Sequence, residues 1–359
     1  MPTVAHRQGI PNVGSSGPED DAPMEEKHEQ FWRGRDVLVT GGAGFIGSHL
    51  AESLDRKGAR VRVLDNFESG SQSNLAGFQS DFRRGDLFDI DTCEESCDGI
   101  DVVFNLAAKV AGVGYNVGHQ ADMFYRNSVL NLNMLEAARR KDVDRYVVVS
   151  SACVYEREAP VPTVEEDGFT GDPEPTNLGY GWAKRLAEVQ ARVYADQYGM
   201  KISIVRPYNT YGPRDHFDDA NGHVIPTLIR KVWTADKEVN VWGNGQQRRS
   251  FVYIDDLVRG LLLSPELHPV PDPVNIGSDE EASIGEVVKT LVRISGKRLQ
   301  VRFDESKPSG QNRRLPDLSK ARKLLGYSPK VSLEEGLANT VRWYESHRGA
   351  RRVAPVASR

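Results

Sequence analysis

The sequence predicts an α/β protein built on a doubly wound parallel sheet, with a smaller C-terminal α/β lobe. Continuous apolar strand patterns alternate with amphipathic helix patterns from about residue 34 to residue 207, which is typical of a parallel sheet covered on both faces. A glycine-rich loop at 41–47 joins the first strand pattern to a helix pattern. Beyond Pro207, prolines such as Pro271 and Pro316 separate shorter elements, which indicates a smaller lobe.

The loop Gly41-Gly42-Ala43-Gly44-Phe45-Ile46-Gly47 predicts a phosphate-binding turn. Its glycines allow a tight turn, a close approach of the backbone to a pyrophosphate, and packing of the helix against the sheet. The helix N-terminus adds unpaired N–H groups and a positive dipole end. The next strand ends at Asp65, 18 residues beyond Gly47, where an acid bonds the adenosine ribose hydroxyls. These features predict a Rossmann-type domain, and Asp65 favours NAD because a carboxylate repels the 2′-phosphate of NADP.

The composition argues against several classes of protein. The 359 residues have a formal net charge of -5 and 27% charged residues, so we expect no nucleic-acid or membrane surface. No apolar run approaches the roughly 20 residues that span a bilayer, and the N-terminus lacks the apolar segment of a signal peptide. Three cysteines make no disulfide framework, so we expect a cytoplasmic protein. Cys93 and Cys97 are interpreted as a helical pair, and we expect no metal site.

The composition also divides the chain into a NAD-binding domain, a substrate-binding lobe and two tails. Both ends lack apolar periodicity, so we expect them to be flexible. One apolar segment, beginning at Arg249, is expected to return to the main sheet. The expected boundaries are 1–32 for the N-terminal tail, 33–206 plus about 249–265 for the NAD-binding domain, 207–248 and 266–347 for the substrate-binding lobe, and 348–359 for the C-terminal tail.

Tyr180 and Lys184 form a candidate reactive pair. Their spacing of four residues places both side chains on one face of a predicted helix. A neighbouring ammonium favours the tyrosinate and is expected to lower the phenol pKa, which would make Tyr180 a usable proton acceptor. Ser151, at the end of the strand Arg145–Val149, would hydrogen-bond the same substrate oxygen. The alternative is a non-catalytic dinucleotide sensor, which would not need this pair.

The glycine loop, Asn105-Leu106-Ala107-Ala108, Ser151 and the Tyr180/Lys184 pair resemble the extended short-chain dehydrogenase/reductase family of nucleotide-sugar epimerases and dehydratases. The resemblance covers about residues 34–347. It implies that Ser151, Tyr180 and Lys184 form an alcohol/ketone redox triad, and that the protein is a homodimer through the helices flanking the sheet. The implied cofactor-binding residues are Gly41, Gly44, Phe45, Ile46, Gly47, Asp65, Asn66, Asp86, Leu87, Leu106, Ala107, Ala108, Tyr180 and Lys184.

Two branches of this family are similar to the chain beyond these motifs. The stretch Tyr211–Pro226 resembles the GDP-L-fucose synthases, whose matching Cys and His, here Cys153 and His223, exchange protons at sugar carbons 3 and 5. The segments 150–153 and 111–115 look at least as much like the GDP-mannose 3,5-epimerases, which have a lysine where His223 stands. The motifs leave both branches open.

The chemistry of either branch suits these two side chains. Inversion beside a ketone needs a base on one face of the sugar and an acid on the other, and a thiol of pKa about 8.5 and an imidazole of pKa about 6.5 can exchange protons near neutrality. Cys153 follows Ser151 by two residues, so on an extended segment both side chains would face the same side.

The resemblance also implies the residues that hold the nucleotide sugar. Arg249 matches the family's phosphate-binding arginine, and a guanidinium suits a pyrophosphate. Trp242 is expected to flank the base, and Arg313 to add a second charge. The implied substrate-binding residues are Lys109, Gly112, Asn209, His223, Val224, Trp242, Arg249 and Arg313.

We therefore expect an NAD-dependent epimerase of a nucleotide-activated hexose, with transient oxidation at carbon 4 and inversion at carbon 3, carbon 5 or both. A GDP-hexose is favoured, with dTDP and UDP sugars left open. The alternatives are a GDP-4-keto-6-deoxyhexose 3,5-epimerase/4-reductase and another nucleotide-sugar 4-epimerase. The dehydratase branch fits poorly, because Ala152-Cys153 stands where those families have an Asp-Glu pair.

Overall fold

The computed structural model describes residues 30–110, 113–217, 222–306 and 312–347. Residues 1–29 of the expected N-terminal tail and all of the expected C-terminal tail lie outside the described residues. Within the described ranges, we find no helix with the length and apolar character that a bilayer crossing requires.

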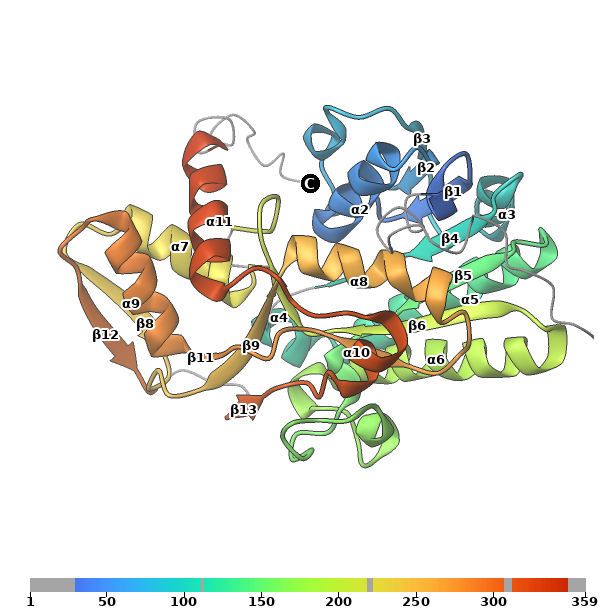
Figure 1. The fold of residues 1–359 in the computed structure, drawn as a ribbon. Coiled ribbons are helices and arrows are strands. Elements are labelled where there is room, and N and C mark those ends of the chain that lie inside the picture. Colours follow the sequence, from blue (N-terminus) through green and yellow to red (C-terminus); the bar gives the residue numbers. More distant parts are fainter. Residues whose placement is uncertain (1–29, 111–112, 218–221, 307–311, 348–359) are drawn as a thin grey trace, which may run out of the picture.

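Seven parallel strands form the main sheet, in the order β10-β6-β5-β4-β1-β2-β3 (Figure 1). The central strands β1, β4 and β5 are almost wholly buried, which explains their continuous apolar sequences and confirms the predicted doubly wound Rossmann-type sheet. The strands are β1 (Asp36–Thr40), β2 (Arg60–Asp65), β3 (Asp81–Arg84), β4 (Val102–Asn105), β5 (Arg145–Val149), β6 (Lys201–Pro207) and β10 (Val274–Ile276).

Helices cover both faces of this sheet, and strand β1 shows how its side chains divide between them. Val39 packs with Leu50 of α2, whereas Leu38 packs with Met134 of α5 on the opposite face. Helices α2 and α8 cover the first face, and α3, α5 and α6 cover the second (Figure 1). The helices are α2 (Phe45–Arg56), α3 (Ile90–Cys97), α4 (Val113–Gly118), α5 (Gln120–Arg140), α6 (Leu178–Tyr198) and α8 (Ile254–Leu267).

The described part of the smaller lobe contains a four-stranded sheet and a two-stranded sheet with helices packed on them (Figure 1). The larger of these sheets consists of β7 (Asn209–Tyr211), β9 (Arg248–Tyr253), β11 (Glu281–Ser283) and β13 (Arg313–Arg314). The smaller pairs β8 (Glu238–Trp242) with β12 (Gln300–Asp304). The remaining helices are α7 (Val224–Thr234), α9 (Ile284–Ser295), α10 (Ser319–Leu325) and α11 (Leu333–His347).

The segment 249–265 corrects one expectation about the main sheet. Its strand part, β9, pairs with β7, β11 and β13 in the smaller lobe, and only the helix that follows, α8, packs on the main sheet. The seventh main-sheet strand is instead β10, which pairs with β6. Apolar residues of β9 such as Val252 made it look like a central strand, but they are buried in the core that also contains residues of α8 and α11. Strand β10 has three residues just after Pro273, too few for a periodic pattern.

Trp32 corrects the boundary of the expected N-terminal tail. Residues 30–32 are helical, and the Trp32 side chain is 1% exposed in the core that contains β1 and β4. Its ring lies 5.8 Å from that of Phe104. The domain therefore begins before residue 33, since the Trp32 side chain covers the sheet. The polar composition of the residues around Trp32 did not indicate this contact.

Candidate active site

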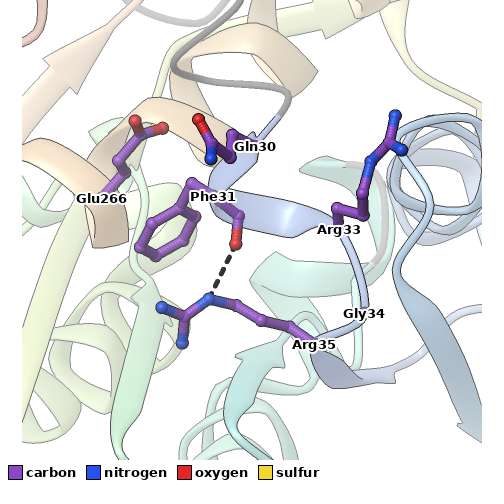
Figure 2. Close-up of a pocket in the computed structure, with 6 residues that line it drawn as sticks. All are labelled: Gln30, Phe31, Arg33, Gly34, Arg35 and Glu266. Carbon is purple, nitrogen blue, oxygen red and sulfur yellow. Dashed lines mark hydrogen bonds between the residues drawn. The ribbon is translucent and has the colours of Figure 1, made fainter. Parts of the chain in front are cut away.

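A cavity of about 760 Å³ lies at the carboxyl ends of the main-sheet strands and is lined by residues of both lobes. Every residue that we predicted to contact the cofactor lines it. The five predicted catalytic residues line it as well: Ser151, Cys153, Tyr180, Lys184 and His223. A second cavity of about 490 Å³ lies beside Phe31 and Glu266 (Figure 2), and none of the described residues lining it is a predicted site residue.

The glycine loop is shaped by close backbone contacts. Gly41 has a φ of +64°, and a Cβ there would lie 2.9 Å from the Ala107 nitrogen. A Cβ on Gly47 would lie 2.2 Å from the Gly41 oxygen. Gly44 is the N-cap of α2, and no described side chain caps this helix, so its first N–H groups are presented at the cavity.

Asp65 ends β2 beside this loop and is 8% exposed. Its carboxylate accepts hydrogen bonds from the Ala43 nitrogen at 3.0 Å and the Phe67 nitrogen at 2.7 Å. Burial raises the pKa of Asp65, and the two N–H donors oppose that effect. The loop and helix suit a pyrophosphate and the carboxylate suits a ribose, so these residues fit a dinucleotide.

Asp86 lines the same end of the cavity from the turn after β3. It accepts hydrogen bonds from the Asn66 side chain at 3.0 Å and from the Phe88 nitrogen at 3.0 Å. Arg60 and Arg62 lie earlier on β2 and pair with Asp36 and Asp81, away from this end of the sheet. Asp65, rather than an arginine of β2, therefore lines this end of the cavity.

Lys184 and Tyr180 lie on one face of α6, as predicted. The Lys184 Nζ donates to the Val149 oxygen at 2.8 Å and lies 5.6 Å from the centroid of the Tyr180 ring. Burial lowers the pKa of Lys184 to about 8. Burial raises the pKa of Tyr180, although a hydrogen bond with Ser151 opposes that effect. The expected lowering of the phenol pKa is therefore wrong for this structure, because removal of the phenolate from water outweighs its neighbours.

The segment after β5 also differs from expectation. We expected an extended chain at 151–153, but Ala152–Val154 form a 3₁₀ turn capped by Ser151. The Ser151 Oγ accepts a hydrogen bond from the Cys153 nitrogen at 3.1 Å, a local contact that competes with extended backbone. Both side chains still line the cavity, and Cys153 is close enough to raise the pKa values of Tyr180 and Lys184.

His223 is the N-cap of α7 and faces the cavity from the smaller lobe. Its Nδ1 lies 3.1 Å from the Asp215 Oδ1. The negative charge of Asp215 raises the pKa of His223, and burial opposes it. Sequence reasoning missed Asp215, because it lies in an irregular loop that has no periodic pattern.

The predicted substrate-binding residues differ in where the structure places them. Lys109, Asn209, Val224 and Arg249 line the cavity. Trp242 is 56% exposed on the two-stranded sheet and lies outside the described lining. Gly112 lies outside the described residues.

The predicted residue Arg313 and its neighbour Arg314 lie differently with respect to the cavity. Arg313 pairs with Glu281 at 2.7 Å and does not line the cavity within the described residues, whereas Arg314 does. Neighbours in a strand point to opposite faces, so Arg314 rather than the predicted Arg313 is the residue of β13 that lines the cavity. Burial lowers the pKa of Arg249 to about 10, and the charge of Arg314 adds to this effect. Arg249 and Arg314 therefore both line the cavity.

A parallel sheet with a glycine loop, a carboxylate at the end of β2 and a Tyr–Lys pair at the strand ends is typical of a dinucleotide-dependent enzyme. Residues 37–277 match the NAD dependent epimerase/dehydratase family, and the chain belongs to that family. Its cofactor is NAD, and it is an enzyme of nucleotide-sugar chemistry.

Curated relatives in several branches are similar to the chain at comparable levels. A dTDP-4-dehydro-6-deoxy-D-allose reductase of Streptomyces sp is 35% identical over 88% of this chain and 98% of its own length. The GDP-L-fucose synthase of Escherichia coli (strain K12) is 32% identical over 86% and 96%. GDP-mannose 3,5-epimerase 1 of Oryza sativa subsp. japonica is 31% identical over 89% and 84%. The relatives include both branches that the sequence motifs indicated.

Solved structures agree with the fold over nearly the whole described chain. An epimerase of Methanothermobacter thermautotrophicus superposes with a TM-score of 0.84 at 28% identity, covering 90% of this chain and 96% of its own. A UDP-glucose 4-epimerase of Thermotoga maritima gives a TM-score of 0.80 at 31% identity, covering 87% and 99%.

Proposed function

We propose that this protein is an NAD-dependent epimerase of a nucleotide-activated hexose that inverts carbon 3, carbon 5 or both. The supporting observation is that Cys153 and His223 line the same cavity as Tyr180 and Lys184. Oxidation and reduction at carbon 4 require the tyrosine and lysine. A thiol and an imidazole beside them supply the extra acid and base that inversion of a neighbouring carbon requires.

Oxidation at carbon 4 begins the reaction. When bound, NAD would supply the hydride acceptor for carbon 4 and, once reduced, the hydride donor. Tyr180 takes the proton of the carbon-4 hydroxyl, and Ser151 hydrogen-bonds the same oxygen. Tyr180 must be a tyrosinate to accept this proton, and burial raises its pKa, so the Lys184 ammonium is needed to stabilise the tyrosinate before the transfer.

The carbon-4 ketone acidifies the hydrogens on carbons 3 and 5. Cys153 and His223 approach the cavity from different lobes, the first after β5 and the second at the start of α7. One side chain removes a proton from the sugar, and the other returns a proton to the opposite face of the ring. The ketone at carbon 4 would then be reduced again, so the reaction would consume no cofactor over one turnover.

A GDP-hexose such as GDP-mannose is the proposed substrate. The relatives named GDP-L-fucose synthase and GDP-mannose 3,5-epimerase support a guanine nucleotide. Arg249 and Arg314 face the cavity together and suit the diphosphate of any nucleotide sugar. The base and sugar are therefore proposed from similarity, and the diphosphate from geometry.

A second candidate is net reduction of a 4-keto sugar. The 35% identity to a dTDP-4-dehydro-6-deoxy-D-allose reductase favours it, and the GDP-L-fucose synthase relative suggests epimerisation followed by reduction. Such an enzyme uses the same Tyr180 and Lys184 but consumes one reduced dinucleotide for each product.

One experiment separates the candidates. The purified protein is incubated with GDP-mannose and with dTDP- and UDP-hexoses, while the sugar signals are followed by NMR and reduced nicotinamide by absorbance. We expect a new hexose epimer from one substrate with no net change in reduced cofactor. Stoichiometric consumption of NADH or NADPH on a 4-keto sugar would contradict the epimerase and support the reductase.

We also propose a homodimer through α5 and α6. Trp182, Val189 and Val193 are 39%, 41% and 51% exposed along one face of α6, and Phe124 of α5 is 43% exposed. In a symmetric dimer, this apolar face of each subunit would be covered by the same face of the other subunit. Light scattering should give twice the chain mass, and Val193→Asp should give the monomer; a wild-type monomer at micromolar concentration would contradict the proposal.

A further inference from the structure

A buried carboxylate stands directly behind His223. Asp215 is 0% exposed, and its Oδ1 and Oδ2 lie 3.1 and 3.4 Å from the His223 Nδ1. The His216 nitrogen donates to the same Oδ1 at 2.7 Å. Asp215 itself lies outside the described lining of the cavity, so it faces the imidazole and not the space beyond it. A buried carboxylate needs such donors, because an unpaired charge is costly to remove from water.

The loop around Asp215 is held on both sides. Arg214 has a φ of +67°, an uncommon left-handed backbone for a residue other than glycine, and its Nη2 donates to the Glu52 Oε2 of α2 at 2.6 Å. On the other side, the Phe217 ring lies 5.7 Å from Trp343 and 4.9 Å from Tyr344 of α11. These anchors fix the turn that directs the Asp215 side chain inward.

We propose that Asp215 is a positioning residue for His223. The Asp215 carboxylate accepts a hydrogen bond from the Nδ1–H group, which fixes the ring orientation and leaves Nε2 as the nitrogen presented to the cavity. Its charge also favours the protonated imidazole. In the proposed acid–base pair of His223 and Cys153, His223 is then the proton donor. This role rests on the proposed function, whereas the contact between the two side chains does not.

Other titratable groups also face the cavity near His223. They are His216 on the same loop, Cys153, Tyr180 and Lys184 on the opposite side, and Arg249 and Arg314 at the diphosphate end. Among the described groups, Asp215 is the one whose charge acts on the His223 pKa. A change in that pKa on removal of the Asp215 charge therefore reports this contact.

The contact is tested first without substrate. Histidine-labelled protein is titrated by NMR, with the His223 signal assigned by its loss in His223→Gln. We expect His223 to titrate above its ordinary pKa of about 6.5, and its pKa to fall in Asp215→Asn because the negative charge is removed. Asp236→Asn, at an exposed turn, is the matched control and should leave the signal unchanged. A wild-type value at or below the ordinary one, or no shift in Asp215→Asn, would overturn the proposal.

The role is tested next by solvent hydrogen exchange into the sugar as a function of pH. In Asp215→Asn the alkaline limb of the rate should move down by the same shift as the His223 pKa, with kcat reduced and KM little changed. An unchanged limb would overturn the role. If Asp215→Asn does not fold, the wild-type His223 titration still decides the contact. Absence of exchange in the wild type, with the His223 shift intact, would defeat the proposed function alone.

Discussion

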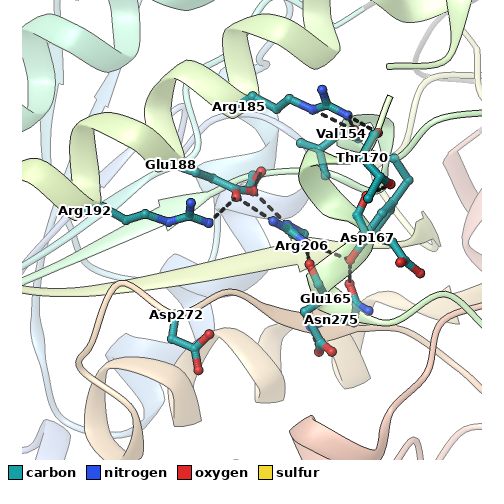
Figure 3. Close-up of polar contacts among 12 residues, drawn as sticks. Val154, Glu165, Asp167, Thr170, Arg185, Glu188, Arg192, Arg206, Asp272 and Asn275 are labelled. Atoms are coloured by element: carbon teal, nitrogen blue, oxygen red, sulfur yellow. Dashed lines mark hydrogen bonds and ion pairs between the residues drawn. The ribbon is translucent and has the colours of Figure 1, made fainter. Parts of the chain in front are cut away.

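Arg206 of β6 and Glu188 of α6 form an ion pair in which both side chains are fully buried (Figure 3). The Arg206 Nε and Nη2 donate to the two carboxylate oxygens at 2.8 and 2.7 Å. The Ser150 Oγ donates to the same carboxylate at 2.6 Å, next to Ser151. Glu188 lies one helical turn beyond Lys184, so this pair fixes the end of β5 relative to the helix that carries Tyr180 and Lys184.

Removing one member of this pair should be strongly destabilising. Arg206→Met leaves the Glu188 carboxylate buried without its main partner, which costs about 3–5 kcal/mol of unfolding free energy. Arg192→Met is the matched control, since Arg192 reaches the same carboxylate from the surface at 3.9 Å and should contribute about 1 kcal/mol or less. Chemical denaturation measures both. Equal losses in the two variants would contradict the importance of the buried pair.

Tyr180→Phe should abolish oxidation of the sugar while leaving the cofactor bound. The variant lacks the phenol oxygen that takes the carbon-4 proton, so we expect a loss of about 10²–10⁴-fold in turnover. Single-turnover absorbance of reduced nicotinamide after mixing with substrate measures the step. Tyr198→Phe, at the exposed end of α6, is the control and should behave as the wild type. Cofactor reduction at the wild-type rate in Tyr180→Phe would contradict the role.

Asp65→Asn should weaken the preference for NAD over NADP. The amide cannot accept hydrogen bonds as a carboxylate does and no longer repels a 2′-phosphate, so NAD affinity should fall about tenfold while NADP affinity rises. Titration of each dinucleotide against tryptophan fluorescence measures both constants. Asp81→Asn is the control, because Asp81 is an exposed carboxylate at the start of the neighbouring strand β3. An unaltered NAD/NADP ratio in Asp65→Asn would contradict this assignment.

Lys184 should make stability depend on pH in the alkaline range. Burial lowers its pKa from 10.5 to about 8, so between these values the unfolded chain binds more protons than the folded protein. The contribution of Lys184 to the free energy of unfolding therefore rises with pH through this window. Wild type minus Lys184→Met, measured by denaturation from neutral pH to about pH 10, should increase by on the order of 3 kcal/mol. A difference independent of pH would contradict the burial of a charged lysine.

Local patterns predicted the parts of the site that depend on local geometry. The glycine loop, Asp65 at the end of β2 and the Tyr180/Lys184 spacing all follow from one strand, turn or helix, and the residues predicted from them to contact the cofactor line the cavity. The carboxyl ends of parallel strands meet at one edge, so residues far apart in sequence could be placed together.

Features that depend on packing between distant segments were missed. Asp215 lies in an irregular loop, and its carboxylate meets the His223 side chain because the start of α7 approaches that loop. The sequence did not indicate that Arg314 lines the cavity, because a two-residue strand does not reveal which of its sides faces the cavity. The pKa of Tyr180 was given the wrong direction because burial cannot be read from residue spacing.

The account depends on a transient ketone beside Cys153 and His223, and exchange of solvent hydrogen into the sugar tests this most directly. The enzyme is incubated with GDP-mannose in heavy water, and deuterium at carbons 3 and 5 is measured by NMR and mass spectrometry. We predict incorporation by the wild type, reduced about 10²–10⁴-fold in Cys153→Ala, while substrate still reduces the bound cofactor transiently. Incorporation at the full rate in Cys153→Ala, or none from any nucleotide hexose in the wild type, would contradict the account.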